Sequence, residues 1–253
     1  MSKKPYDDQD DRIQIPGRKT IDEVFDESTL KVLYRLMSQD VFEYMDYPIS
    51  TGKEAKVFRG VTRGGDTVAI KIMRVNTSIF RDYRQYIEGD YRFKKVGRGR
   101  KLIFTWTRKE FSNLKRMHEG GLRVPRPITF AKNVIVMECL ESQGNIAPML
   151  KYLKLDTDEM QNIHDILVEY LYTLIREVKL VHGDLSEYNI LMVEGEPYMI
   201  DVSQSVPLTH PLAQDLFERD VDNMVRYFSS NGVETTREFI IDKIRMDEMY
   251  EDD

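Results

Sequence analysis

The segment Val181–Ile190, VHGDLSEYNI, contains residue types that could handle a metal ion and a phosphate group. Asp184 and Asn189 lie within it, and Asp201 ends the apolar run YMID that follows. Carboxylate and amide oxygens are the hard ligands that Mg²⁺ takes together with phosphate and water. A carboxylate set apart from the metal can accept a hydroxyl proton or orient a water molecule. Because Asp and Asn are also ordinary turn and capping residues, this segment alone leaves both interpretations open.

A lysine and a glutamate upstream could complete such a site. Lys71 ends the apolar β-type run VAIK, where burying an ammonium is costly unless it finds a partner. Glu110 lies in the segment 106–118, whose apolar residues recur at helical spacing. Each residue also has an ordinary alternative. Lys71 could face water from an edge strand, and Glu110 could be a solvated carboxylate on a helix.

The turn at residues 50–57, STGKEAKV, lies between two β-type segments. Its small residues and its glycine could let backbone N–H groups approach phosphate oxygens. It matches neither the Walker A motif nor the full G-x-G-x-x-G pattern. Taken alone, it is better explained as an ordinary turn.

The elements that must position these residues begin with helices. Residues Thr20–Glu23 have capping-box spacing, and the apolar pattern predicts one or two helices over 20–46, ended by Pro48. The runs VFRGVT and TVAIKIM then predict strands joined by a hairpin turn at residues 63–66. A helix over 106–118 follows, and RPITFAKN and NVIVMECL predict two more strands.

The second half of the sequence is dominated by helical patterns. Its longest apolar stripe predicts a helix over 156–180, with Asp156 and Glu159 at capping positions. The segment ILMVEGEPYMID predicts a strand, a turn and a strand, and helices are expected over 211–230 and from about Thr236. This order of elements predicts an α+β fold with two lobes.

The predicted organisation has three parts. Residues 1–47 form a tail with accessory helices, and 48–140 form a β-rich N-terminal lobe. Within that lobe, 76–104 are expected to be a long loop or a poorly ordered insert. Residues 141–253 form a helical C-terminal lobe that carries the catalytic and metal-binding loops.

Composition limits the class of protein. The chain has 253 residues, 41% of them hydrophobic, and a formal net charge of −6, which excludes an overall polybasic nucleic-acid binder. The single Cys139 cannot form an intrachain disulfide, and the polar start MSKKPYDDQDDR lacks the apolar core of a signal peptide. No apolar run approaches the ~18 residues that span a bilayer, so we expect a cytoplasmic protein without membrane partners.

The combined order of these features is far more specific than any one of them. The segments STGKEAKVF, VAIKI, TWTRKEFSNLKRM, VHGDLSEYNIL and IDVSQSV resemble signature segments of the protein kinase superfamily, and within it of the atypical RIO kinases. IDVSQSV and the long insert after VAIK resemble the first RIO subfamily. The resemblance covers about residues 48–230 and implies a bilobal kinase-like fold with a truncated C-terminal lobe and extra N-terminal helices.

The resemblance also implies ATP as ligand, with Mg²⁺ or Mn²⁺, and a role for each motif. Lys71 would hold ATP phosphates and pair with Glu110, Asp184 would be the catalytic base, and Asn189 and Asp201 would bind the metal. Asp201 would also be a candidate phosphoryl acceptor. Further ATP contacts would come from a phosphate-binding loop, Ser50, Thr51, Gly52, Lys53, Glu54, Ala55 and Val57, and from the backbone of Glu138 and Leu140 at the hinge.

RIO proteins are described as serine kinases, with autophosphorylation, and as ATPases that assist small ribosomal subunit maturation. The implied partner is therefore a precursor of that subunit, with no DNA expected and a monomer favoured. Two departures from ordinary kinases affect the chemistry. Gly183 replaces an arginine that would pair with an activation-loop phosphate, and Ser186 replaces a lysine near the γ-phosphate. Transfer to protein substrates is therefore expected to be slow.

The insert has a charge of opposite sign to that of the chain. Residues 81–101 hold eight basic and three acidic residues, with aromatic residues between them. They predict contact with ribosomal RNA, or else a solvated loop near ATP. The basic residues are Arg81, Arg84, Arg92, Lys94, Lys95, Arg98, Arg100 and Lys101, and the aromatic ones are Tyr83, Tyr86, Tyr91 and Phe93.

Two other functions fit the motifs in part. Small-molecule phosphotransferases of the aminoglycoside-kinase type also use an H-G-D-x-x-x-x-N loop, although VSQS and the basic insert argue against this class. A nucleotide-gated assembly factor would need ATP binding without chemistry. The presence of Lys71, Asp184, Asn189 and Asp201 together argues against that second alternative.

Overall fold

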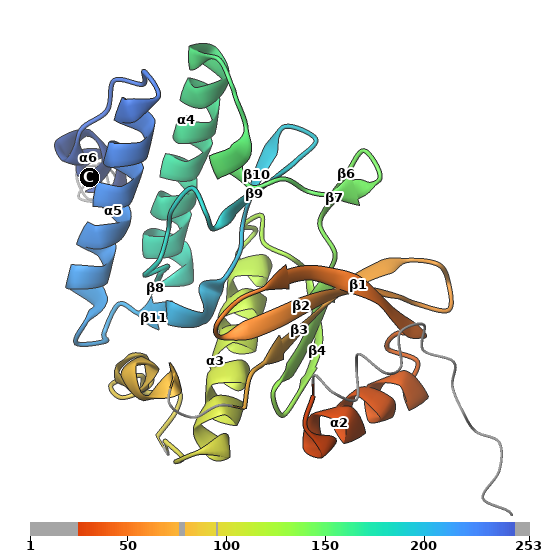
Figure 1. Ribbon diagram of the computed structural model, residues 1–253. Helices are drawn as coiled ribbons and strands as arrows, with labels where there is room; N and C mark the ends of the chain where they lie inside the picture. Colours follow the sequence, from red (N-terminus) through yellow and green to blue (C-terminus); the bar gives the residue numbers. More distant parts are fainter. Residues whose placement is uncertain (1–24, 76–78, 95, 246–253) are drawn as a thin grey trace, which may run out of the picture.

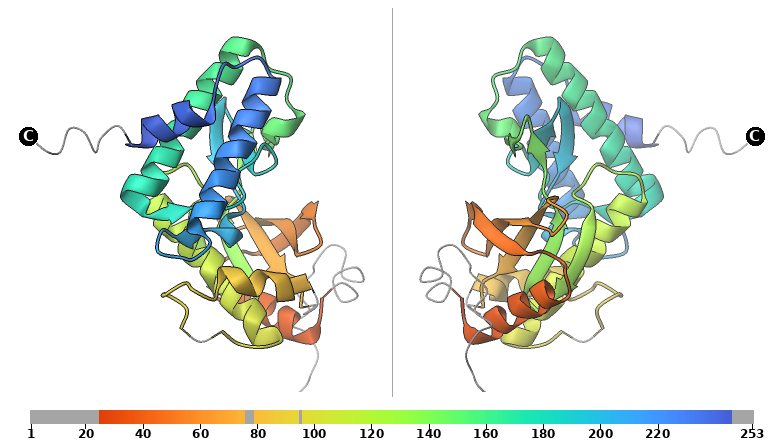
Figure 2. Two further views of the ribbon diagram at one scale, coloured as in Figure 1. Left: turned by 90° about the vertical axis from the view of Figure 1, so that its left-hand side faces the viewer. Right: turned by 90° about the vertical axis from the view of Figure 1, so that its right-hand side faces the viewer.

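The computed structural model describes residues 25–75, 79–94 and 96–245, and it confirms the predicted α+β, kinase-like fold (Figure 1). A five-stranded antiparallel sheet of order β1-β2-β3-β5-β4 forms the first half, and a group of helices forms the second. The two halves lie one above the other in every view (Figure 2). The strands of the sheet are β1 (Tyr44–Thr51), β2 (Ala55–Val61), β3 (Thr67–Met73), β4 (Pro127–Ala131) and β5 (Val134–Glu138).

The sheet packs between two helices, α2 (Glu27–Ser38) and α3 (Arg100–Glu119). Alternate residues of β3, including Ile70, join the apolar cluster that contains the buried face of α2. Met73, on the other side of the strand, packs with Trp106 of α3. Because side chains alternate along a strand, Lys71 points to the side of the sheet that α3 covers.

The prediction that helices over 20–46 end at Pro48 is wrong for the C-terminal end of this range. Helix α2 ends at Ser38, and Pro48 lies inside strand β1. The backbone of Asp40 is left-handed, with φ 56°, which no helix can continue through. Strand β1 is at the sheet edge and its register shifts at Pro48, which is where a strand tolerates proline.

The N-terminal cap of α2 is Asp26, whose carboxylate accepts from the N–H groups of Ser28 and Thr29 at 3.0 and 3.3 Å. The capping box predicted at residues 20–23 lies outside the described residues. The predicted hairpin turn at 63–66 is confirmed between β2 and β3.

The insert is more ordered than predicted. Its described part contains a 3₁₀ helix, η1 (Ile79–Tyr86), and α3 begins at Arg100 rather than at residue 106. Tyr86 and Phe93 are each only 8% exposed and belong to the core that includes Trp106. The Tyr83 ring also lies against that of Trp106, with 5.0 Å between centroids. These rings serve packing, so they are not exposed platforms for bases.

The helical half follows the predicted order. Helix α4 (Thr157–Thr173) continues as a π-helical turn, η3 (Leu174–Val178), and the capping box of Asp156 and Glu159 is confirmed. Within the described ranges no helix has the length and apolar character needed to cross a membrane. The other elements are β6 (Glu141–Ser142), β7 (Asn145–Ile146), η2 (Leu150–Tyr152), β8 (Leu180–Val181), β9 (Ile190–Val193), β10 (Glu196–Met199), η4 (Val202–Gln204), β11 (Val206–Pro207), α5 (Ala213–Ser230) and α6 (Arg237–Arg245).

Candidate active site

A short hairpin brings the two predicted metal ligands together. Strands β9 and β10 pair antiparallel, with Ile190 opposite Met199. Asn189 precedes β9 and Asp201 follows β10, so both lie beyond the open end of the hairpin. The N–H of Ile200 donates to the carbonyl of Asn189 at 2.9 Å, which extends this pairing to the site itself.

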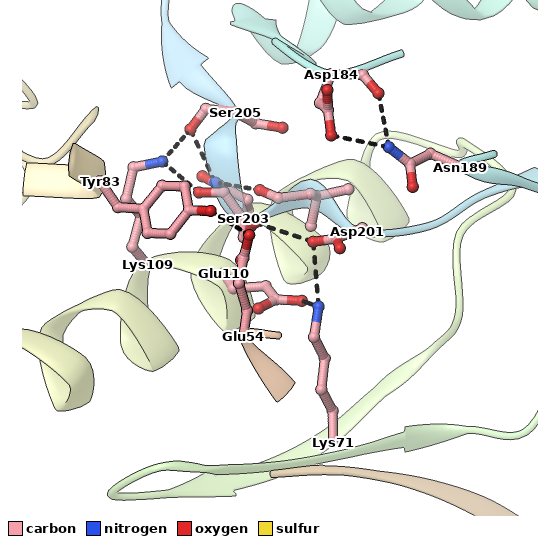
Figure 3. Close-up of polar contacts among 12 residues, drawn as sticks. Glu54, Lys71, Tyr83, Lys109, Glu110, Asp184, Asn189, Asp201, Ser203 and Ser205 are labelled. Carbon is pink, nitrogen blue, oxygen red and sulfur yellow. Dashed lines mark hydrogen bonds and ion pairs between the residues drawn. The ribbon is translucent and has the colours of Figure 1, made fainter. Parts of the chain in front are cut away.

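Asn189 and Asp184 are joined directly (Figure 3). The Asn189 Nδ2 donates to the Asp184 carbonyl at 2.8 Å and to its Oδ2 at 3.0 Å. Since the amide nitrogen is used in this way, the amide oxygen of Asn189 is left for another ligand. Burial raises the pKa of Asp184, and the charge of Asp201 adds to that shift. A raised pKa suits a carboxylate that accepts a proton near neutral pH.

Asp220 of α5 holds the loop that carries Asp184. Its carboxylate accepts from the N–H groups of Gly183 at 2.7 Å and Leu185 at 2.8 Å. Burial raises the pKa of Asp220 to about 7. The sequence analysis missed this residue. The available signal was its place four residues after Leu216 and four before Met224, on the apolar stripe of the helix.

The structure gives a local reason for Gly183. Its φ is +81°, in the left-handed region, and an added Cβ would lie 3.3 Å from the Gln204 carbonyl oxygen. The Arg219 guanidinium donates to the Gly183 carbonyl and to Gln204 Oε1. Arg219 of α5 therefore brings a cation to this loop, although Gly183 takes the place of the loop arginine of ordinary kinases.

Lys71 joins the sheet to both α3 and the hairpin (Figure 3). Its Nζ lies 2.6 Å from Glu110 Oε1 and 3.1 Å from Asp201 Oδ1. The Lys71 side chain is 10% exposed and that of Glu110 4%, whereas Asp201 keeps 41% of its side chain exposed. The predicted pair of Lys71 with Glu110 is therefore present in the structure, and Asp201 remains open on one side.

Burial and charge set the protonation of this group. Burial alone would lower the pKa of Lys71, but Asp201 and Glu110 together raise it above its ordinary value. Burial raises the pKa of Glu110 to about 7, against the opposing charge of Lys71. Burial would also raise the pKa of Asp201, yet Lys71 holds it below the usual range. The ionised lysine and the ionised Asp201 therefore form the stable charged pair.

Two polar residues of α3 hold the backbone after Asp201, and sequence reasoning missed both. Lys109 Nζ donates to the carbonyls of Ser203 at 2.8 Å and Ser205 at 2.5 Å. Asn113 Nδ2 donates to the carbonyls of Val202 at 2.8 Å and Ser205 at 2.9 Å. Asp201 itself is left-handed, with φ 55° and ψ 61°. A strained turn of this kind persists only where its surroundings fix it, as α3 does here.

The predicted phosphate-binding turn leads towards Lys71. Residues 50–53 are exposed, and Val57 of β2 lies opposite Lys71 in the β2–β3 register. The Gly52 N–H donates to the Ala55 carbonyl at 2.9 Å, which closes the turn. The Tyr83 hydroxyl donates to the Glu54 carboxylate and so ties the insert to this turn. Phosphate binding by Ser50, Thr51, Gly52, Lys53, Glu54, Ala55 and Val57 stays a prediction.

The predicted adenine contacts lie where the chain leaves the sheet. The Glu138 N–H donates to the Arg126 carbonyl at 2.9 Å, and its Oε2 accepts from the Arg126 N–H at 3.0 Å. The Leu140 carbonyl accepts from the Ala147 N–H at 2.9 Å. These bonds fix the segment between β5 and β6, and adenine binding there stays a prediction.

The residues present fit a Mg²⁺ ion held with phosphate. Both contacts of the Asp201 carboxylate use Oδ1, which leaves Oδ2 as an oxygen donor beside the amide oxygen of Asn189. In the described part of the chain no three His, Cys, Asp or Glu residues cluster as a metal site. Mg²⁺ does not need such a cluster, because it takes one or two protein carboxylates and completes its shell with phosphate and water.

Comparisons with known proteins show the family of this chain. A family model described as RIO domain matches residues 56–240. The RIO-type serine/threonine-protein kinase Rio1 of Haloferax volcanii is 39% identical over 228 residues, covering 89% of this chain and 77% of the relative. Rio1 of Methanocaldococcus jannaschii is 41% identical, covering 85% and 73%. RIO1 of Saccharomyces cerevisiae is 34% identical, covering 93% of this chain but only 54% of that protein.

A solved structure supports the same assignment. The Rio2 kinase of Chaetomium thermophilum, described as a complex with ADP, Mg²⁺ and phosphoaspartate, superimposes with a TM-score of 0.66 at 25% identity. The match covers 84% of this chain and 64% of that one. From its motifs, its fold and these relatives, the chain belongs to the RIO family of atypical serine/threonine protein kinases, and within it to the Rio1 group.

Proposed function

We propose that this kinase binds ATP with Mg²⁺ and transfers the γ-phosphoryl group either to a serine hydroxyl, including its own, or to water. The observation that carries the proposal is the joint placement of two groups. Lys71 contacts both Glu110 and Asp201, while Asn189 is bonded to Asp184 at the end of the same hairpin. A phosphate held by Lys71 would therefore lie beside a metal site and a candidate base.

The chemistry follows from these positions. The Lys71 ammonium binds phosphate oxygens, and Asn189 and Asp201 are the residues that would hold Mg²⁺, which neutralises phosphate charge when bound. Asp184 accepts the proton of the attacking hydroxyl as the new O–Pγ bond forms. The bond between Pγ and the β–γ bridging oxygen breaks at the same centre, and ADP leaves. Ser186 supplies no cation for the γ-phosphate, which supports slow transfer to protein substrates.

Transfer to water could proceed in two steps. Asp201 Oδ2 would attack the γ-phosphorus to give an aspartyl phosphate, which water then hydrolyses. The exposed side of Asp201 supports this route, and so does the phosphoaspartate named for the solved Rio2 structure. The chain would then act as an ATPase as well as a kinase.

Purified protein incubated with γ-labelled ATP and Mg²⁺ tests the proposal, with Asp184→Asn and Asp201→Asn alongside. Acid-stable label that both variants lose would identify a hydroxyl kinase. Hydroxylamine-labile label that only Asp201→Asn loses, together with free phosphate, would identify the aspartyl-phosphate route. Bound ATP with neither label nor free phosphate would overturn phosphoryl transfer.

We further propose that this activity serves maturation of the small ribosomal subunit in the cytoplasm. Membership of the Rio1 group and the resemblance of the motifs support this role. The buried, free thiol of Cys139 is compatible with a reducing compartment. Sedimentation of the kinase with subunit precursors, and its loss from them after ATP turnover, would test the proposal.

A further inference from the structure

A hollow of about 430 Å³ lies on the outer side of α3, away from the residues that hold ATP in our proposal. We call it the α3–β4 pocket. Its volume falls within the roughly 300–1,000 Å³ of sites that bind small molecules and cofactors. The residues used below line it: Phe93, Lys94, Phe104, Arg108, Phe130 and Lys132.

The pocket and the candidate active site use different sides of one helix. At 3.6 residues per turn, Arg108 and Glu110 point about 200° apart around α3. Glu110 is buried against Lys71, whereas Arg108 is exposed and lines the pocket. A ligand in the pocket would therefore not compete with ATP for space.

Unpaired cations gather in this pocket. Lys94, Arg108 and Lys132 are exposed, and none has a carboxylate within 4 Å among the described residues, where the ion pairs involve other cations. Among the described residues no acidic side chain lines the pocket, although the chain as a whole carries a net charge of −6. Three like charges without partners in one hollow favour an anionic ligand with several charges.

One cation of the lining already has partners. Arg92 also lines the hollow, but its Nη2 lies 2.7 Å from Asp90 Oδ2 and 2.8 Å from Asn113 Oδ1. This cation is already neutralised and serves to fix the segment. The charge available to a ligand therefore comes from Lys94, Arg108 and Lys132.

Aromatic rings lie among these cations. Phe130 is 37% exposed at the end of the edge strand β4, and Phe104 is half-buried on α3. The Arg108 guanidinium also lies 5.9 Å from the centre of the Phe93 ring, which is buried and therefore not available for stacking. Exposed rings beside cations are what single-stranded nucleic acids use, because bases stack on the rings while phosphates meet the cations. Phe130 packs on Phe111 with 4.8 Å between ring centroids and keeps 37% of its surface exposed, and an acidic peptide would not need that exposed ring.

We propose that the α3–β4 pocket binds single-stranded nucleic acid. A base would stack on Phe130 or Phe104, and the flanking phosphates would contact Lys94, Arg108 and Lys132. This proposal does not depend on phosphoryl transfer. It also extends the expected contact from the basic insert, to which Lys94 belongs, to Arg108 and Lys132 in two other parts of the chain.

Fluorescence anisotropy of a labelled oligouridine of about 12 nucleotides tests the proposal, since site sizes run from ~4 to 16. The test variant is Arg108→Glu with Lys132→Glu. The control carries the same charge change at Lys154→Glu with Lys243→Glu, two exposed lysines without an ion pair in the described ranges. We expect the test variant to lose at least about tenfold in affinity. The plot of log affinity against log salt concentration should become less steep by about 1.4, that is by about 0.7 for each lost phosphate contact.

Phe130→Ala provides a second test that does not alter charge. We expect about tenfold weaker binding with an unchanged salt slope, because stacking is lost while phosphate contacts remain. Melting curves that match the wild type show that each variant is folded, and oligothymidine alongside distinguishes RNA from DNA. Equal affinity of the test and control variants would overturn the proposal. Displacement by oligoglutamate, with no effect of Phe130→Ala, would also overturn it and identify an acidic protein segment instead.

Discussion

Arg108 and Lys109 are neighbours in α3 with opposite environments. Lys109 is fully buried and donates to the carbonyls of Ser203 and Ser205. Arg108 is exposed in the α3–β4 pocket, with no carboxylate within 4 Å in the part of the chain that the structure describes. One step along a helix turns a side chain by about 100°, so adjacent cations can have different roles.

The difference extends over the whole helix. The inner side of α3 uses Lys109, Glu110 and Asn113, and each of them is held by named partners. On the outer side Arg108 is exposed without a carboxylate within 4 Å among the described residues, and Lys115 is exposed and pairs only with Glu119 of the same helix. Buried cations with fixed partners position a reacting site, whereas exposed cations without partners can recognise a ligand. The following changes test whether residues on the inner side have effects that exposed positions lack.

Loss of Lys71, which contacts Glu110 on the inner side of α3, should have the largest effect on activity. Lys71→Met removes the ammonium that neutralises phosphate charge in our proposal, and we expect phosphoryl transfer to fall by about 10²–10³-fold. Steady-state release of phosphate from ATP measures this loss, with Lys243→Met as the control. A folded Lys71→Met protein with the wild-type rate would contradict the assigned role.

Replacing the two neighbours separately sharpens the comparison. Lys109→Met leaves two buried carbonyls without their donor, and relief of the buried charge offsets part of that loss. We expect the free energy of unfolding to fall by about 2 kcal/mol. Arg108→Met should change it by less than about 0.5 kcal/mol. Urea unfolding measures both values, and equal changes would remove the distinction between the two sides.

Asn113 should affect turnover more than binding. Asn113→Ala frees the backbone after Asp201, which misplaces the carboxylate without removing it. We expect kcat to fall about tenfold, with little change in KM for ATP. Lys115→Ala, on the exposed side of α3, is the matched control. A raised KM with unchanged kcat would show that Asn113 acts on nucleotide binding instead.

Lys109 should also make stability depend on pH. Burial lowers its pKa from 10.5 to about 7, the charge of Arg92 lowers it further, and the charges of Asp90 and Glu110 oppose this shift. Between these values the unfolded chain still holds the proton and the folded protein has released it, so a rising pH favours folding. We expect the free energy of unfolding to gain about 2 kcal/mol from pH 7 to 9, relative to Lys109→Met. If plots of the free energy of unfolding against pH were parallel for the wild type and Lys109→Met, the lowered pKa of Lys109 would be contradicted.

Residues that lie in linear motifs were predictable from the sequence. The structure brings Lys71 to Glu110, as the resemblance implied, whereas the hydrogen bond of Asn189 to Asp184 was not predicted. Hydrophobic periodicity also predicted most helices and strands. It failed at Pro48, because an edge strand with a register shift tolerates a proline that normally ends an element.

Residues that support the motifs were not predictable. Asp220, Lys109 and Asn113 are single polar residues on helices, and only three-dimensional packing shows that each holds a loop backbone. The α3–β4 pocket was also missed, since Arg108 and Lys132 lie outside the basic insert. Sequence patterns show charge runs within one segment, whereas folding joined cations from separate segments.

The most direct test compares ATP turnover of Glu110→Gln and Arg108→Gln, without nucleic acid, at equal protein concentration. Both substitutions remove one charge from α3, two positions apart. We expect Glu110→Gln to slow turnover at least about tenfold, because Lys71 loses its buried partner. Arg108→Gln should stay within about twofold of the wild type, a change below about 0.5 kcal/mol. Equal loss in both variants would contradict the division of α3 into a side that builds the active site and a side that does not.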